Sequence, residues 1–360
     1  MTAIVKILPE DLRLVNTRAA DYSETVRQFR EFQAGPDDDG RRLDRIVRKF
    51  LPEASLPEIY RALRTGDIRL GQKKALPSTR VTADDRIQIA EIIFVSVSER
   101  GGRTGSQPRG KADAGKDIVL LETRHLLFIS KPRGMLSHGH EGLDFLVRER
   151  YRDSIQTSLS FVPSPLHRLD RNTSGIIACS RSIEGARVFS TLLREGGLSK
   201  HYLAVVEGEA RDSEDWVDSI HRDEALKISK VWTSEDEGMS RPAITRFRPL
   251  LSRQGLTLAL FSIETGLTHQ IRVQAAWHGH PLSGDGKYGG RAEAGASASG
   301  MDAHGGKAGA GSYVLHAWRL LFDRPPFDDV PSVIEAPLPA ESAAILERHF
   351  GETWSSALPG

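Results

Sequence analysis

The segment Pro165–Gly175, which reads PLHRLDRNTSG, says more about this protein than any other stretch of its sequence. The apolar residues 176–179, IIAC, follow it directly. A Thr-Ser-Gly turn that runs into small and β-branched apolar residues predicts a loop entering a short, buried strand. The segment therefore presents one acid, Asp170, on a loop that is backed by the core.

Asp170 is flanked in the sequence by positive or potentially positive side chains, namely His167, Arg168 and Arg171. If these groups lie close to the carboxyl group, they lower the pKa of Asp170 and keep it ionised. An ionised carboxylate in a basic cleft suits either covalent attack on an electrophile or a structural ion pair. The residue types alone favour the ion pair, because most perturbed acids are structural.

The size and composition of the chain limit the class of protein to which it can belong. A length of 360 residues indicates two or three domains. We expect no transmembrane helix and no secretory signal, because no apolar run is long enough and the N-terminus has no apolar core before a cleavage site. The single cysteine, Cys179, excludes an intrachain disulfide. These features predict a cytoplasmic protein without a membrane partner, and a monomer is the default expectation.

Positive charge is concentrated near the N-terminus. The whole chain has a net charge of +1, but residues 41–90 contain 12 Lys and Arg against 6 Asp and Glu, so +6 lies here and the rest sums to −5. Apolar residues at helical spacing from Leu43 to Phe50 predict a helix with a basic outer face. A second helix is expected between Pro57 and Gly66, followed by a strand, a turn and a strand over residues 68–74 and a closing strand at 86–89.

This pattern resembles the small RNA-binding module first described in ribosomal protein S-four. The resemblance implies a small α/β domain at 41–92 that binds RNA phosphates. A solvated basic helix remains the alternative, because most charge runs are solvated. The residues expected to contact RNA in this module are Arg42, Arg45, Arg48, Arg69 and Lys73.

The rest of the chain predicts a larger domain at 117–345. Strands are expected at 118–121, 126–129, 175–180, 200–208, 243–247 and 256–263, with an amphipathic helix at 183–195. Many strands with few helices indicate an α+β fold with a mainly antiparallel sheet rather than a doubly wound one. Residues 1–40 form an N-terminal extension in this scheme. A flexible basic linker covers 93–116, and a Gly/Ala-rich insertion covers 291–312.

Four motifs of the larger domain resemble the RluA family of pseudouridine synthases, which isomerise uridine within RNA. The motifs are KPxG at 131–134, HRLDRxTSG at 167–175, KxYxAxVxG at 200–208 and GxTHQIRV at 266–273. The resemblance covers residues 117–340. Two positions depart from the family pattern, because Leu267 replaces an arginine and Gln274 replaces a histidine.

The resemblance implies a role for each matched residue. Asp170 is the expected nucleophile, Arg272 its ion-pair partner, and Tyr202 the aromatic residue that stacks on uracil and serves in removing the proton from ring carbon five. Arg168 is expected to fill the space that the flipped uridine leaves in the RNA. Arg171 is expected to contact an RNA phosphate. Lys131 is expected to supply a positive charge near the cleft and to contact RNA. The family's isomerisation needs neither a metal nor another cofactor.

Several alternatives remain open from the sequence. The carboxylate could attack the sugar carbon or act as a base on the sugar. Structured RNA is the expected partner; large-subunit ribosomal RNA or its precursor is favoured, with transfer RNA as the alternative. A non-catalytic RNA-binding factor is a second class of function. A retaining glycosidase is a third, and it requires a second acid about 5 Å from the first.

Overall fold

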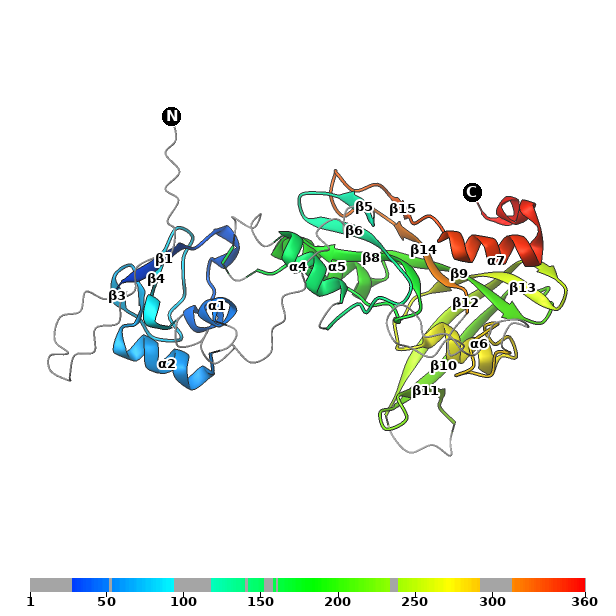
Figure 1. The fold of residues 1–360 in the computed structure, drawn as a ribbon, viewed down its shortest axis with the longest axis horizontal. Helices are drawn as coiled ribbons and strands as arrows, with labels where there is room; N and C mark the ends of the chain where they lie inside the picture. The colour runs from blue at the N-terminus through cyan, green and yellow to red at the C-terminus, as the bar shows by residue number, and fades with distance from the viewer. Residues whose placement is uncertain are drawn as a thin grey trace, which may run out of the picture.

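The computed structural model describes residues 28–51, 54–93, 118–139, 142–151, 158–159, 161–233, 239–291 and 313–359. It contains a small N-terminal unit and a larger unit built on one long sheet (Figure 1). Most of the expected N-terminal extension, nearly all of the expected linker and most of the Gly/Ala-rich insertion lie outside the described residues.

The small unit packs two helices on a four-stranded antiparallel sheet of order β1-β4-β2-β3. Its helices lie where the apolar spacing predicts them, and Gly66 ends the second in the left-handed conformation, with φ at 82°. In the first helix Leu43, Ile46 and Val47 are fully buried, whereas Arg45 and Arg48 face solvent. The elements are β1 (Phe29–Gln33), η1 (Pro36–Asp38), α1 (Leu43–Phe50), α2 (Leu56–Thr65), β2 (Ile68–Leu70), β3 (Lys73–Lys74) and β4 (Arg86–Ala90).

This unit begins earlier than the sequence suggested. Residues 29–33, which were expected in the N-terminal extension, form β1 and pair with β4 in antiparallel register. The strand is an edge strand with polar residues on its outer side, so it lacks the apolar alternation that would have revealed it. The turn-rich residues 35–40 lie inside the unit, because Asp38 is completely buried there.

Asp38 also joins the two units. Its carboxylate accepts hydrogen bonds from the Ser158 hydroxyl at 2.8 Å and from the Leu159 amide at 2.6 Å. Leu159 packs against the core of the small unit. A short segment that precedes the signature loop is therefore anchored on the N-terminal unit.

The larger unit is an α+β domain with a mainly antiparallel sheet of 11 strands, as predicted. The strand order is β11-β10-β12-β13-β9-β14-β8-β6-β5, with β15 beside β14 and β7 beside β8, and of the strands described only β8 and β14 run parallel. Its strands are β5 (Val119–Glu122), β6 (Leu126–Lys131), β7 (Ser164–Pro165), β8 (Ser174–Ser180), β9 (Leu198–Glu207), β10 (Glu214–Asp223), β11 (Ile228–Val231), β12 (Ser240–Arg253), β13 (Leu256–Ile263), β14 (Leu315–Phe322) and β15 (Val333–Glu335).

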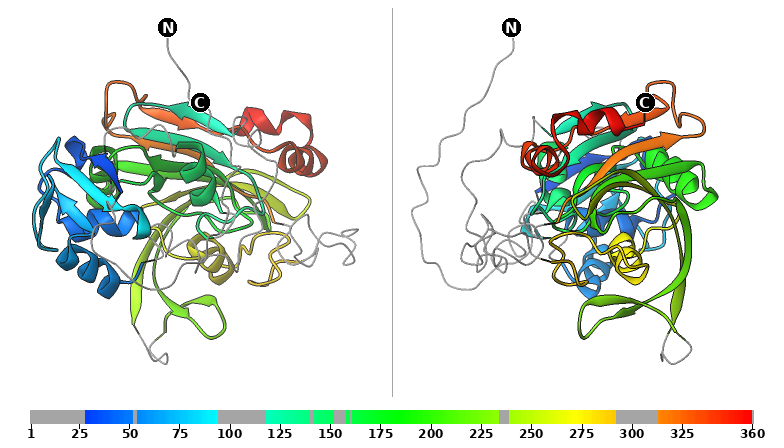
Figure 2. Two further views of the ribbon diagram at one scale, coloured as in Figure 1. Left: turned by 60° about the vertical axis from the view of Figure 1, so that its left-hand side comes forward. Right: turned by 90° about the vertical axis from the view of Figure 1, so that its right-hand side faces the viewer.

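Helices cover both faces of this sheet. On one face α4 (Leu143–Tyr151) and α6 (Gln270–Trp277) pack against the largest apolar cluster, and α6 lies within the curve of the sheet (Figure 2). On the other face lie α5 (Ile183–Glu195), α7 (Ala340–Phe350) and the short η2 (Glu352–Ala357). The faces alternate along β8, where Ile177 belongs to the first cluster and Ile176 to the opposite one.

The domain also extends beyond its expected end at residue 345. The last two turns of α7 bury Leu346 and Phe350 against β9 and β13. Leu358 packs on the same cluster. Among the described residues no helix is long and apolar enough to span a bilayer.

Candidate active site

The signature loop is held by the only parallel strand pair of the described sheet. Residues 166–173 connect β7 to β8, and β8 begins where Ser174 and Gly175 pair with His316 and Ala317 of β14. Gly175 has a φ of 108°, and a Cβ atom there would lie 2.2 Å from the Ala317 carbonyl oxygen. The Ser174 hydroxyl lies 2.9 Å from His316 Nδ1. The Ser-Gly pair of the motif is thus explained by close backbone approach.

The interior of the loop is occupied by His167 and Leu169. The Ala178 amide donates to His167 Nε2 at 3.0 Å, and burial lowers the pKa of His167 to about 3. A neutral ring therefore ties the loop to β8, which agrees with the structural role expected for this residue. Leu169 is buried, and its backbone exchanges hydrogen bonds with the Ser137 hydroxyl.

Lys131 does not face the cleft, contrary to the sequence-based expectation. Its side chain is fully buried, and its ammonium group donates to the carbonyl oxygens of Pro132, Met135 and Arg171 at 2.9–3.2 Å. Burial lowers the pKa of Lys131 to about 7. The lysine joins the KPxG turn to the signature loop, and an RNA contact does not fit this position, because no part of the side chain is exposed.

Arg171 lies on the surface of the same junction. Its guanidinium Nε donates to the Gly134 carbonyl at 3.0 Å, while the Gly134 amide donates to the Arg171 carbonyl. The side chain is exposed. Arg168 is also exposed and lines the cavity beside Asp170.

Asp170 lies at the rim of the buried region, with 18% of its side chain exposed. Its Oδ2 atom is 3.6 Å from Arg272 Nη1 and 3.8 Å from His269 Nε2. Burial raises the pKa of Asp170 above its ordinary value, while the charges of Arg272, Arg168 and Lys131 act against this rise. The sequence predicted a lowered pKa if the flanking groups lay close; Arg168 does act in that direction, but burial outweighs the nearby cations.

Arg272 has a stronger partner than Asp170. Its Nε and Nη2 atoms donate to the two carboxylate oxygens of Asp285 at 2.6 and 2.8 Å. The guanidinium carbon lies 5.0 Å from the ring centre of Tyr288 and 4.7 Å from that of Tyr313. The pair with Asp285 fixes the Nε–Nη2 edge of the guanidinium group, and Nη1 lies toward Asp170.

The contribution of Asp285 to the site was not predicted from the sequence, because its turn-like neighbours indicate no more than a loop position. It is 1% exposed, and the backbone of Gly290 folds back onto it. An acid in the Gly-Asp turn shortly after α6 was the available signal, but only the tertiary structure shows which arginine it meets.

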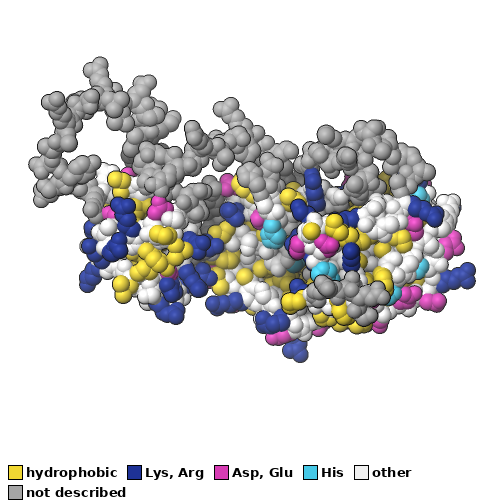
Figure 3. Space-filling model, turned by 90° about the horizontal axis from the view of Figure 1, so that it is seen from below, with side chains coloured by type: hydrophobic (Ala, Val, Ile, Leu, Met, Phe, Trp, Pro, Cys, Tyr) yellow, Lys and Arg dark blue, Asp and Glu magenta, His cyan; other side chains and the backbone are white. Residues whose placement is uncertain are grey.

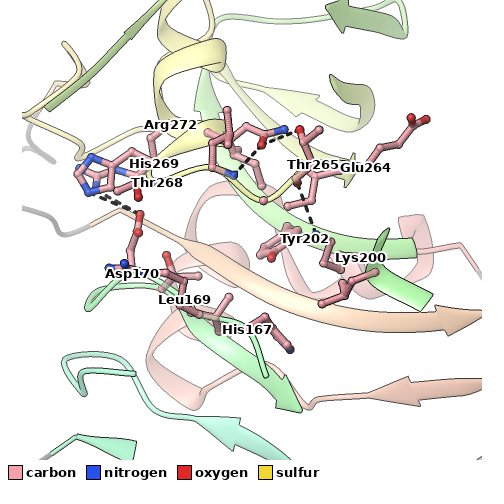
Figure 4. Close-up of a pocket in the computed structure, with 18 of the residues that line it drawn as sticks. His167, Leu169, Asp170, Lys200, Tyr202, Glu264, Thr265, Thr268, His269 and Arg272 are labelled. Atoms are coloured by element: carbon pink, nitrogen blue, oxygen red, sulfur yellow. Dashed lines mark hydrogen bonds and ion pairs between the residues drawn. The ribbon is translucent and has the colours of Figure 1, made fainter. Parts of the chain in front are cut away.

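Tyr202 lies on the face of β9 that contacts the largest apolar cluster and is 6% exposed. Burial, with a smaller effect of Asp170, raises the pKa of its phenol well above the ordinary value. The group is therefore a neutral phenol at physiological pH. Two residues earlier on the same face, Lys200 directs its ammonium group toward the Thr265 carbonyl, at 3.5 Å, and burial lowers its pKa to about 8 (Figure 4).

These side chains surround one cavity of about 550 Å³. Asp170 enters from the signature loop, Tyr202 from β9, and Arg272 from α6 (Figure 4). The volume lies within the range of about 300–1,000 Å³ that is typical of small-molecule pockets. The wall has a basic character suited to a phosphate-bearing ligand, because five Lys and Arg line it against two acids, namely Arg168, Arg194, Lys200, Arg241 and Arg272 against Asp170 and Glu264.

The two residues that differ from the family motif, Leu267 and Gln274, lie in different environments. Leu267 lines the cavity, so the arginine expected there is replaced by an apolar side chain. Gln274 is fully buried, accepts from Thr245 and donates to Asp218 at 2.7 Å in each case. It therefore fastens α6 to β10 and β12 and does not face the cavity.

The N-terminal unit presents basic side chains, as Figure 3 shows for one face. Arg45, Arg48 and Lys73 are exposed. Arg42 is tied to Asp44 by two hydrogen bonds of 2.7 and 3.1 Å. Arg69 donates to the Gly66 carbonyl and lies over the ring of Phe29, so its position is set from inside the unit.

Comparisons with known proteins agree with this fold and site. A family model described as RNA pseudouridylate synthase matches residues 125–277. The ribosomal large subunit pseudouridine synthase C of Escherichia coli (strain K12) is 33% identical over 309 residues, which cover 84% of this chain and 91% of the relative. The protein of the same name from Salmonella typhi is 32% identical over 318 residues, covering 86% and 93%.

A solved human structure, RNA Pseudouridylate Synthase Domain Containing 4, superposes with a TM-score of 0.52 at 21% identity and covers 65% of this chain and 94% of its own. Its likeness supports the fold. The match to the family model and the relatives that are about one-third identical place the chain among the enzymes that isomerise uridine in RNA. The chain belongs to the RluA family of RNA pseudouridine synthases and is an RNA pseudouridine synthase.

Proposed function

We propose that this enzyme isomerises specific uridines of large-subunit ribosomal RNA and that Asp170 starts the reaction. The relatives that are about one-third identical over nine-tenths of their length are named for that RNA. The observation that carries the role of Asp170 is its place in the cavity, where its carboxylate is partly exposed beside Arg272. Ribosomal RNA in the cytoplasm is the substrate that this proposal implies.

The target uridine must leave its stack before its sugar can reach Asp170, at a cost of a few kcal/mol. Arg168 is exposed beside Asp170 at the cavity and carries a planar guanidinium group. Such a group can stack on the neighbouring bases and donate hydrogen bonds at the same time. We assign Arg168 to the space that the flipped base leaves.

The carboxylate then acts on the sugar. In one route an Asp170 oxygen bonds to the anomeric carbon as the bond to the uracil nitrogen breaks, and the electron pair leaves with the uracil. In the other route Asp170 removes a proton from the sugar. In the first route ring carbon five bonds to the anomeric carbon as the bond to Asp170 breaks, and in the second it bonds there as the sugar regains its proton. Either way the uracil has turned, ring carbon five gives up its proton, and the nitrogen that was bound to the sugar gains one. No atom is gained or lost overall.

Arg272 and Tyr202 support these steps in different ways. Arg272 orients the carboxylate and favours its charged form against the effect of burial. The ring of Tyr202 offers a face for the uracil, and its neutral phenol oxygen can accept the proton from ring carbon five only if it passes its own proton on. Because burial raises its pKa, Tyr202 is not a phenolate before the reaction begins.

A retaining glycosidase is not favoured by this geometry. The second acid that lines the cavity, Glu264, is exposed and points away from Asp170 (Figure 4). Asp285 is buried, and both of its oxygens accept hydrogen bonds from Arg272. The pair of cooperating carboxyl groups that glycoside hydrolysis needs is therefore not formed by the acids that line the described cavity.

The test is a pseudouridine map of ribosomal RNA by carbodiimide-stop sequencing. A deletion strain is supplied with the wild type, with Asp170→Ala or with Asp170→Asn. Sites that appear only with the wild type establish the activity, the role of Asp170 and the target uridines together. If no ribosomal site differs, the ribosomal assignment is dropped and transfer RNA is mapped in the same strains.

An RNA-binding measurement separates catalysis from simple binding. Asp170→Asn keeps the size of the side chain, so the purified variant should retain the RNA affinity of the wild type while forming no product. If both RNA classes lack an Asp170-dependent site and binding persists, the non-catalytic RNA-binding alternative replaces this proposal.

A further inference from the structure

His269 stands out because both nitrogens of its ring face polar groups of the site. It immediately precedes α6, with φ at 59° and ψ at 21°, a conformation that residues other than glycine rarely adopt. Its Nδ1 atom lies 2.7 Å from the Tyr288 hydroxyl. On the other side of the ring, Nε2 lies 3.8 Å from Oδ2 of Asp170 (Figure 4).

The hydrogen bonds behind the ring indicate where its proton lies. The Ser229 amide on β11 donates to the Tyr288 hydroxyl oxygen at 2.9 Å, because an amide N–H can only donate. The hydroxyl has one proton of its own to donate, and we assign it to the 2.7 Å contact with His269 Nδ1. A ring that accepts at Nδ1 and is neutral carries its proton on Nε2.

The surroundings keep this ring neutral. Burial lowers the pKa of His269 to about 3, and the charges of Arg272, Lys287, Arg222 and Arg168 act in the same direction. The group of opposite charge that faces the ring is Asp170. The effect of burial and of four cations thus outweighs that of one partly exposed carboxylate.

Two donors therefore converge on a single oxygen of Asp170. Arg272 Nη1 is 3.6 Å from Oδ2, and His269 Nε2 is 3.8 Å from the same atom. Both distances are slightly longer than hydrogen bonds, as is common in catalytic sites without substrate. Contacts on Oδ2 alone orient the carboxylate and leave its other oxygen, Oδ1, for the sugar.

We propose that His269 is a positioning residue that acts as a neutral Nε2–H donor and, together with Arg272, holds Oδ2 of Asp170 so that Oδ1 is presented to the target nucleotide. The inference rests on the proposed role of Asp170. A neutral donor orients the carboxylate without adding a second positive charge beside it, so the oxygen that acts on the sugar keeps its electron density.

The chain from Ser229 to Asp170 also links the β10–β11 hairpin to the site. Ser229 is fixed a second time, because its hydroxyl donates to the Thr268 carbonyl at 2.6 Å. The hairpin therefore holds both Tyr288 and the residue that precedes His269. Removing only the Tyr288 hydroxyl should loosen the imidazole while the aromatic ring still covers Arg272.

The first test is nitrogen-15 NMR of the full chain labelled at histidine, with the His269 signals assigned by their loss in His269→Gln. We expect an unprotonated Nδ1 and a protonated Nε2, with no titration between about pH 5.5 and 8.5, the range in which an ordinary histidine would titrate. A proton on Nδ1, or an imidazolium at pH 7, would overturn the inference. In Tyr288→Phe the Nδ1 signal should move, because it loses its donor.

The second test is kinetic. His269→Ala should lower kcat by about 10²-fold, the scale of a small misplacement of a reacting group, and leave KM for the RNA nearly unchanged. His269→Gln places an amide N–H close to the position of Nε2 and should recover part of kcat. The matched control is His201→Gln, since His201 lies on β9 beside Tyr202 but does not line the cavity.

The outcomes separate this inference from the proposed function. If Asp170→Ala remains active, the proposed role of Asp170 fails whatever the state of the His269 ring. If Asp170→Ala is inactive but His269→Ala keeps the wild-type kcat, only the positioning role fails. A loss of kcat that His269→Gln does not relieve at all indicates packing rather than donation, and this result also overturns the inference.

Discussion

Replacing Asp285 by asparagine would break one half of a buried ion pair while keeping the size of the side chain. The two oxygens of Asp285 accept from Arg272 at 2.6 and 2.8 Å, and the side chains are 1% and 7% exposed. Asparagine offers one acceptor oxygen where two donors arrive, and its NH₂ group would face a guanidinium N–H. The charge of Arg272 would then lie among aromatic rings with Asp170 as its remaining acidic partner.

The expected loss of stability follows from these contacts. A charge-assisted hydrogen bond contributes about 1.5–3 kcal/mol, and removing one partner of a buried ion pair costs about 3–5 kcal/mol. We therefore expect Asp285→Asn to lower the free energy of unfolding by about 3–5 kcal/mol. For a domain of this size the corresponding fall in Tm is roughly 6–20 °C.

The assay is urea and thermal unfolding followed by tryptophan fluorescence, because Trp216 lies in the core of the same domain. Asp215→Asn is the matched control. Asp215 accepts from Arg246 at 2.8 Å, but the two side chains are 65% and 64% exposed, so about 0–1 kcal/mol should be lost. Equal losses in the two variants would refute the argument that burial gives the Arg272 pair its importance.

Three further outcomes are expected. Gly175→Ala should prevent folding of the larger unit, seen as insoluble protein, since its Cβ would lie 2.2 Å from the Ala317 carbonyl oxygen; a soluble, active variant would contradict this. The free energy of unfolding should rise from about pH 7 to about pH 10.5, because folded Lys131 and Lys200, with pKa values of about 7 and about 8, release their protons while the unfolded lysines retain theirs up to the ordinary value of 10.5. Lys200→Met should reduce that rise, and an unchanged slope of unfolding free energy against pH would show that Lys200 does not contribute to it. Replacing Arg45 and Arg48 by glutamine should flatten the salt dependence of RNA binding, measured by filter binding, by about one unit of slope for each phosphate that these side chains neutralise. An unchanged slope would remove α1 from the RNA interface.

The local parts of the site were predictable from the sequence. Asp170, Tyr202 and Arg272 occur within recognisable motifs, and the structure brings all three to one cavity. The charge state was not predictable. Of the sequence neighbours of Asp170, His167 is neutral and Arg168 opposes the rise in the pKa, but burial has the larger effect, and Arg272, from another element, also contributes. Burial depends on how the whole domain packs, which a motif does not report.

The partners of the predicted residues were harder to infer than the residues. Asp285 is 13 positions from Arg272, beyond the end of α6, so no helical spacing links them. Lys131 illustrates the opposite error, because it was expected near the cleft in contact with RNA and is instead buried under three carbonyl groups. In each case the deciding contact joins a regular element, α6 or β6, to a loop, and loop paths follow from tertiary packing.

The parallel contact between β8 and β14 also has a consequence for biosynthesis. Ser174 and His316 are separated by 142 positions, so the loop that carries Asp170 receives its last support from a strand made far later. A ribosome would have to add most of the larger domain before this loop could adopt its final form. Contacts of such long sequence separation form slowly. Nascent or truncated chains that end before β14 should therefore be inactive, which keeps the enzyme from acting on RNA before its synthesis is complete.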